Sequence, residues 1–103
     1  MAYDAGSFDA TLAAAAGDDP ELLAQLRAGF IESLGVQVDL LRRARCDGNW
    51  EVAAQRLKGL GASFHTTELV RLADEALDSA PGEPTVLRKL DRLCADFIAS
   101  QQG

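Results

Sequence analysis

The sequence predicts an all-α protein: an antiparallel up-down four-helix bundle with a short extra helix at its N-terminal end. Three observations predict this class. Alanine and leucine are abundant whereas β-branched and aromatic residues are sparse, which favours helices over strands. Apolar residues recur every three or four positions along most of the chain. Short turns interrupt this periodicity, and short turns make successive helices antiparallel neighbours.

We expect a single domain spanning residues 1–103, because this length suits one hydrophobic core and no repeat or linker divides the chain. The first predicted element is a short helix from Phe8 to Ala16, ended by Gly17. The segment Asp18-Asp19-Pro20-Glu21 then predicts a helix start. Asp19 can cap the helix, Pro20 suits the first helical position, and acidic side chains favour the positive end of the helix dipole.

The second predicted helix is long and runs to about Arg45, with Gly35 inside it at a cost of about 1 kcal/mol relative to alanine. One apolar stripe follows it: Leu22, Leu26, Phe30, Leu34, Val38 and Leu41. We predict that Cys46-Asp47-Gly48-Asn49 forms a tight turn, in which Gly48 adopts the left-handed conformation and Asn49 caps the next helix.

The third predicted helix runs from Trp50 to about Phe64, and a fourth follows a cap at Thr66 or Thr67. Residues 79–84 form a loop, and Pro84 opens the last helix. The predicted inward residues of these three helices are Trp50, Ala53, Ala54, Leu57, Leu60, Gly61 and Phe64; Leu69, Leu72, Ala73, Ala76 and Leu77; and Val86 or Leu87, Leu90, Leu93, Cys94 and Phe97.

The net charge and the hydropathy of the chain limit the classes of partner that it can bind. The net charge of −6 argues against binding to nucleic acid or to an anionic membrane surface, since both require a cationic face. No stretch approaches the roughly 20 apolar residues that cross a bilayer, and the start Met1–Gly6 does not resemble a secretory leader. These observations predict a soluble cytoplasmic protein.

Metal and thiol chemistry has little support. The chain holds two cysteines, Cys46 and Cys94, and one histidine, His65, whereas a structural zinc site needs about four such ligands at suitable spacing. We expect no metal and no cofactor. The sequence leaves a disulfide open but favours reduced cysteines. Cys94 lies on an apolar stripe and is predicted to be core, and a reactive thiol at Cys46 has weak support.

One stripe of the third helix differs from an ordinary solvated face. At about 100° per residue, Gln55, Lys58, Gly59 and Ala62 share one side of the helix, offset from the apolar stripe. Glycine destabilises a helix interior, and here it follows Gln55 by one turn, leaving room for another protein to approach the backbone. The stripe therefore predicts a docking face centred on Gln55. The alternatives are a helix–helix contact that needs a small residue at Gly59, or simple drift of the residue pattern without a function.

The segment Trp50-Glu51-Val52-Ala53-Ala54-Gln55-Arg56-Leu57-Lys58-Gly59 resembles the central helix of histidine-phosphotransfer (HPt) domains, which reads Ala-His-x-Leu-Lys-Gly. The Asp-Asp-Pro-Glu-Leu start, the long second helix with Phe30, the Gly48-Asn49-Trp50 turn and the leucine pattern after the motif also suit this family, so the resemblance covers nearly the whole chain. In HPt domains the histidine accepts a phosphoryl group from a receiver-domain aspartate and passes it on. Lys58 and Gly59 match the lysine beside that group and the glycine that admits the receiver.

Gln55 occupies the phosphoacceptor position and is the departure from the family. An amide is not nucleophilic and cannot form the phosphoramidate that an imidazole forms, although it can donate and accept hydrogen bonds. The resemblance therefore implies a two-component signalling protein that is not an enzyme and has no catalytic residue. It would dock onto a response-regulator receiver domain or a histidine kinase. The implied partner-binding residues are Gln55, Arg56, Lys58, Gly59 and Ala62, with Arg56 adding charge at the rim.

Two other functions remain open. A working phosphorelay intermediate would use His65, which lies 10 residues beyond Gln55, about 15 Å along the helix axis and about 280° around it. Relatives usually carry glycine there, and histidine at a positive φ in the turn is the more favoured interpretation. Alternatively, a structural bundle forms a homodimer over Gly59 and Ala62, instead of the expected monomer. Lys58 argues against such an apolar seam.

Three charged clusters are interpreted as structural. The acidic groups Asp18-Asp19 and Asp74-Glu75-Asp78 lack complementary ligands and suit helix starts or a solvated helix face. The basic group Arg42, Arg43 and Arg45 complements the dipole at the end of the second helix.

Overall fold

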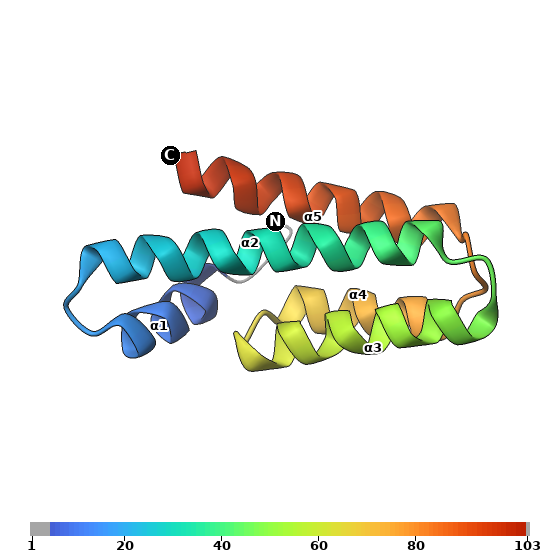
Figure 1. Cartoon of the computed structure of the whole chain (residues 1–103), viewed down its shortest axis with the longest axis horizontal. Helices are drawn as coiled ribbons and strands as arrows, with labels where there is room; N and C mark the ends of the chain where they lie inside the picture. Colours follow the sequence, from blue (N-terminus) through green and yellow to red (C-terminus); the bar gives the residue numbers. More distant parts are fainter. Residues whose placement is uncertain (1–4, 103) are drawn as a thin grey trace.

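The computed structural model describes residues 5–102, and within them the side chains of residues 8–100. The expectation about a leader rests partly on residues 1–4, which lie outside this part. The described chain consists of five helices without strands (Figure 1): α1 (Ala5–Ala16), α2 (Pro20–Arg43), α3 (Asp47–Ser63), α4 (Thr67–Leu77) and α5 (Pro84–Gln102). The prediction of an all-helical bundle is confirmed.

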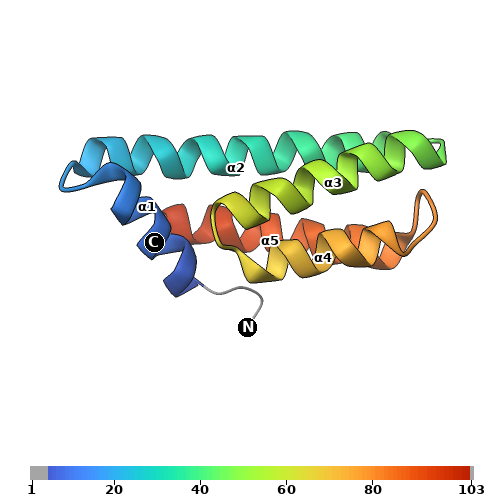
Figure 2. The ribbon, with the colours of Figure 1, turned by 90° about the horizontal axis from the view of Figure 1, so that it is seen from below.

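Four of the helices form a closed ring. α2 packs against α3 and α5, and α4 packs against the same two helices. Figures 1 and 2 show these four helices running side by side along the long axis of the molecule, which measures 44 Å. α1 packs against α2 and crosses one end of the ring (Figure 2).

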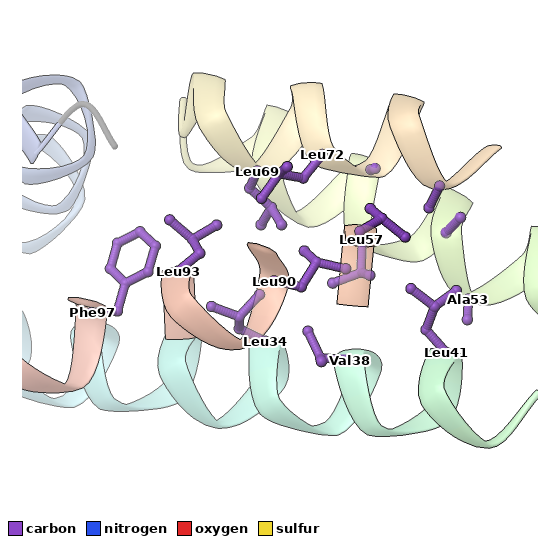
Figure 3. Packing of buried hydrophobic residues seen from close by; sticks show 14 of the residues in the cluster. Leu34, Val38, Leu41, Ala53, Leu57, Leu69, Leu72, Leu90, Leu93 and Phe97 are labelled. Atoms are coloured by element: carbon purple, nitrogen blue, oxygen red, sulfur yellow. The ribbon is translucent and has the colours of Figure 1, made fainter. Parts of the chain in front are cut away.

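The core fills the inside of the ring with the residues that the apolar periodicity selects (Figure 3). Val86 is fully buried while Leu87 is partly buried, so both alternatives for the start of the last inward stripe contribute. Leu22 departs from the predicted stripe, since its side chain is 36% exposed. Leu23 packs against the core in its place, so the inward side of α2 begins one residue later than predicted.

The four phenylalanines of the chain come together at the end of the ring that α1 covers. Phe30 lies at the centre, with ring centroids 4.7 Å from Phe8 of α1, 4.9 Å from Phe64 and 5.0 Å from Phe97. Aromatic pairs at such separations add stability beyond their buried area. This cluster explains how a 12-residue helix, too short to be stable alone, is held in place.

The first turn is as predicted. Gly17 ends α1 with φ +64°, a conformation that side chains other than glycine rarely adopt. The carboxylate of Asp19 accepts hydrogen bonds from the backbone N–H groups of Glu21 (3.0 Å) and Leu22 (3.2 Å), which caps α2.

The predicted turn between α2 and α3 is wrong. α3 begins at Asp47, so Gly48 and Asn49 are helical residues of its first turn, and α2 ends at Arg43 rather than Arg45. The chain changes direction through Ala44 and Cys46, which are both extended, so no left-handed glycine is needed. Ala44 is buried, and this tertiary contact outweighs the local turn preference of Gly48 and Asn49.

The turn between α3 and α4 has the positive φ predicted for His65, at 56°. Thr66 is the N-cap residue of α4, as one of the two predicted choices, but its hydroxyl donates to the carbonyl of Gly61 (3.2 Å) instead of capping. A Cβ at Gly61 would lie 3.0 Å from Cγ2 and 3.1 Å from the backbone N of Val70. α3 and α4 therefore approach closely at Gly61.

Candidate functional site

The proposed docking stripe lies on the outer side of α3. Gln55, Arg56, Gly59 and Ala62 are exposed, and the side chain of Lys58 is 44% exposed. The opposite side of the helix is buried through Ala53, Ala54, Leu57 and Gly61. The fold therefore leaves the five predicted residues accessible to a partner, while their role in binding stays a prediction.

A buried hydrogen bond contributes to the rotational position of α3. The indole Nε1–H of Trp50, on the first turns of α3, donates to the backbone carbonyl of Ala76 on α4 over 2.7 Å. Both groups are buried, and a buried polar pair of this kind has a narrow range of acceptable geometries. With Trp50 held inward, the stripe one turn later faces solvent.

The intramolecular explanation for Gly59 is wrong. A Cβ built at Gly59 would meet no atom of another segment within 4 Å, because the helix is open to solvent at this point. The close helix–helix contact occurs at Gly61, two residues later. No packing within the described chain requires glycine at position 59, and without a side chain there the surface beside Gln55 is open.

Lys58 is not a free cation in this structure. Its Nζ lies 2.9 Å from Oδ1 of Asp74 on α4, and both side chains are about half exposed. Exposed ion pairs of this kind stabilise a fold by less than about 1 kcal/mol, so a competing carboxylate can displace Asp74. Sequence reasoning missed this pairing because it depends on the register between two helices, not on spacing within one.

Gln55 borders a hollow between α3 and the end of α4. The hollow has a volume of about 450 Å³ and is lined by Asp47, Trp50, Glu51, Gln55, Leu77 and Ser79. Two carboxylates thus precede the amide at intervals of one helical turn. The i, i+4, i+8 spacing of Asp47, Glu51 and Gln55 is present in the sequence, but the predicted helix begins at Trp50 and leaves Asp47 outside it.

His65 lies apart from this hollow. Its side chain is exposed in the turn after α3, and its Nδ1 lies 2.8 Å from Oγ1 of Thr11 on α1. This contact links the turn to the helix that covers the end of the ring. The structure therefore gives His65 a local structural contact in addition to its predicted turn conformation.

Three residues of the charged clusters form ion pairs between helices. Asp74 pairs with Lys58, and Glu75 pairs with Lys89 of α5 at 3.1 Å. Arg42 forms a bidentate pair with Asp91 of α5, at 2.5 and 3.2 Å. Within residues 5–102, no three His, Cys, Asp or Glu side chains are grouped closely enough to hold a metal ion.

The two cysteines are free thiols in different surroundings. Cys46 is exposed, whereas Cys94 is partly buried on α5. Burial, followed by the nearby carboxylate of Asp91, raises the pKa of Cys94 from 9.0 to about 11. Cys94 is therefore protonated and a weak nucleophile near neutral pH.

Comparison with known proteins found no matching family model, no matching curated protein and no matching solved structure. None of the helices in residues 5–102 has the length and hydropathy needed to cross a membrane.

Proposed function

We propose that this chain is an HPt-like module, an up-down four-helix bundle that docks onto a receiver domain or a histidine kinase without carrying phosphate. The observation that supports this most is Gly59. It is a helix-interior glycine with open space around it, one turn after Gln55 and beside a lysine. Such a residue weakens its own helix by about 1 kcal/mol, and no packing in the described fold compensates for it.

The chemistry of Gln55 supports docking without transfer. Its amide is exposed at the edge of the hollow between α3 and α4, where a partner can reach it. The amide can donate and accept hydrogen bonds in a polar pocket, but it does not attack phosphorus. A partner would thus be held without a phosphoryl group being moved.

Lys58 supplies the charge that suits a receiver. The resemblance to HPt domains places this lysine beside the acidic pocket of the receiver. On docking, the ammonium group would leave Asp74 for the carboxylates of the partner. The ion pair with Asp74 is exposed, so its loss would reduce the free energy of binding only slightly. The chain would then regulate signalling by occupying the docking surface of its partner.

The test is phosphoryl transfer to wild type and to Gln55→His from a panel of labelled receiver domains. We expect acid-labile label on Gln55→His and none on the wild type. Gln25→His is the matched control, because Gln25 is an exposed glutamine on α2, and this variant should stay unlabelled. Label on wild type that disappears in His65→Asn would instead establish His65 as a phosphocarrier. Absence of label on Gln55→His with every receiver would count against the HPt-like docking face.

A further inference from the structure

A second groove lies between α2 and α3, whereas the hollow beside Gln55 lies between α3 and α4. Its volume is about 370 Å³, and its lining is Leu40, Arg43, Ala44, Asn49, Val52, Ala53 and Arg56. Arg56 is also the predicted partner-binding residue at the rim of the stripe, but the other lining residues are not among the predicted partner-binding residues. The groove is therefore a separate surface that adjoins the stripe.

The groove exposes aliphatic side chains that the monomer does not cover. Val52 is 50% exposed and Leu40 is 36% exposed, and Val36, one turn before Leu40 on α2, is 51% exposed. Single exposed aliphatic residues are ordinary on protein surfaces, but three neighbours along one helix pair form a patch. Covering this patch with an apolar partner would remove it from water.

The charge of the groove is opposite to that of the chain. The whole chain carries −6, yet the lining contains two arginines and no acidic residue. Arg43 pairs with Asp39 at 3.0 Å. Arg56 forms no ion pair with any residue whose side chain is described, so its charge is available to a partner.

These charges distinguish between occupants. A second copy of this chain packed symmetrically on the groove would bring the unpaired Arg56 of both copies into one interface, and these like charges oppose association. An acidic partner meets no such penalty. The lining of α3 runs from Asn49 to Arg56, about 10 Å or two helical turns. That length suits two turns of a helix laid along the groove with its apolar side inward.

We infer that the groove between α2 and α3 binds an acidic amphipathic helix of a partner protein. Leucine-type side chains of that helix would rest on Leu40 and Val52, and one of its carboxylates would meet Arg56, whose charge is unpaired. A second carboxylate would compete with Asp39 for Arg43. The inference goes beyond receiver docking. The two surfaces share Arg56, but Leu40, Arg43 and Val52 belong to the groove alone.

Three synthetic helical peptides of equal length test it. The first peptide carries a stripe of leucines along one side of the helix, flanked by glutamates. The second has lysines in place of the glutamates, and the third has serines in place of the leucines. Each peptide is titrated into the isotope-labelled chain. Only the glutamate peptide should cause NMR chemical-shift changes around Leu40, Val52 and Arg56 that saturate with peptide concentration. Arg56→Glu should weaken that binding about tenfold, the size expected for one interfacial charge contact, and should improve binding of the lysine peptide.

Arg92→Glu is the matched control, since Arg92 is an exposed arginine of α5 outside the groove. It makes the same change in net charge and should leave peptide affinity within about twofold of wild type. Arg56→Gln provides a milder variant if the reversal disturbs folding. Equal binding of the glutamate and lysine peptides, equal effects of Arg56→Glu and Arg92→Glu, or no saturable shifts would overturn the inference. Shifts centred on Gln55 and Gly59 instead would assign the peptide to the stripe.

Discussion

The indole N–H of Trp50 donates to the carbonyl of Ala76 across the interface between α3 and α4, at 2.7 Å. Both residues belong to the core, and the bond adds a directional contact to the packing that holds α3 against its neighbour. The outward direction of the stripe is consistent with this contact and with the burial of Ala53, Ala54 and Leu57.

Trp50→Phe should therefore lower the free energy of unfolding by about 1–3 kcal/mol, from the lost hydrogen bond and the smaller ring. The backbone N–H of Ser79 still donates to the Ala76 carbonyl at 3.0 Å, so that oxygen keeps one partner. Urea unfolding followed by circular dichroism measures the change. An unchanged midpoint would show that the indole bond does not stabilise the helix pair.

The two glycines of α3 should respond oppositely to alanine. Gly59→Ala should stabilise the fold by about 0.5–1 kcal/mol, because alanine is the better helix former and its Cβ meets open space. Gly61→Ala should destabilise it by about 1–3 kcal/mol, because its Cβ would press on the backbone of Val70 at 3.1 Å. Paired thermal unfolding of the two variants checks this, and shifts of the same sign would contradict it.

Asp74→Asn should free Lys58 at little cost to stability, less than about 1 kcal/mol, because the ion pair is exposed. Under the proposed function, the variant should bind a receiver domain more tightly than wild type, whereas Lys58→Ala should bind more weakly. Glu75→Gln is the control. It also removes one negative charge from α4, but it breaks the ion pair with Lys89 of α5 and leaves Lys58 paired. Isothermal titration with one receiver compares the three. Tighter binding by Glu75→Gln as well would indicate a general charge effect.

The cysteines should differ in reactivity toward a thiol reagent at pH 8. Cys46 is exposed and should react rapidly, whereas Cys94 should react slowly because burial and a pKa of about 11 keep it protonated. Kinetics of Cys46→Ser and Cys94→Ser, each with one remaining thiol, separate the two rates. Similar rates in both variants would contradict the burial of Cys94.

The raised pKa also predicts a pH dependence of stability. The folded state favours the protonated thiol, while the unfolded chain loses that proton near the ordinary value of 9.0. The contribution of Cys94 is therefore complete below pH 9 and is lost as the pH rises toward about 11. The free energy of unfolding of wild type and of Cys94→Ala, measured between pH 8 and 11, isolates the contribution of this thiol. If the two proteins show the same dependence on pH, the prediction is wrong.

Much of the fold followed from local patterns. Apolar spacing predicted the helices and most inward residues, since a core-facing helix repeats its buried side every three or four positions. Asp19 and Pro20 predicted the start of α2 because capping acts within one turn. The start of α3 was predicted three residues late, because burial of Ala44 decides where the chain bends and overrides the turn preference of Asn49.

By itself, the sequence determined the helical class, the composition of the core and the side of α3 on which Gln55, Lys58 and Gly59 lie. These properties depend on residues close together along one helix. Only the tertiary structure decided that Lys58 pairs with Asp74, that Gly61 rather than Gly59 packs between helices, and that two grooves of different charge flank α3. Each of these depends on how two helices are rotated and offset against each other. That relation arises from side-chain packing across the whole core, which no local spacing encodes.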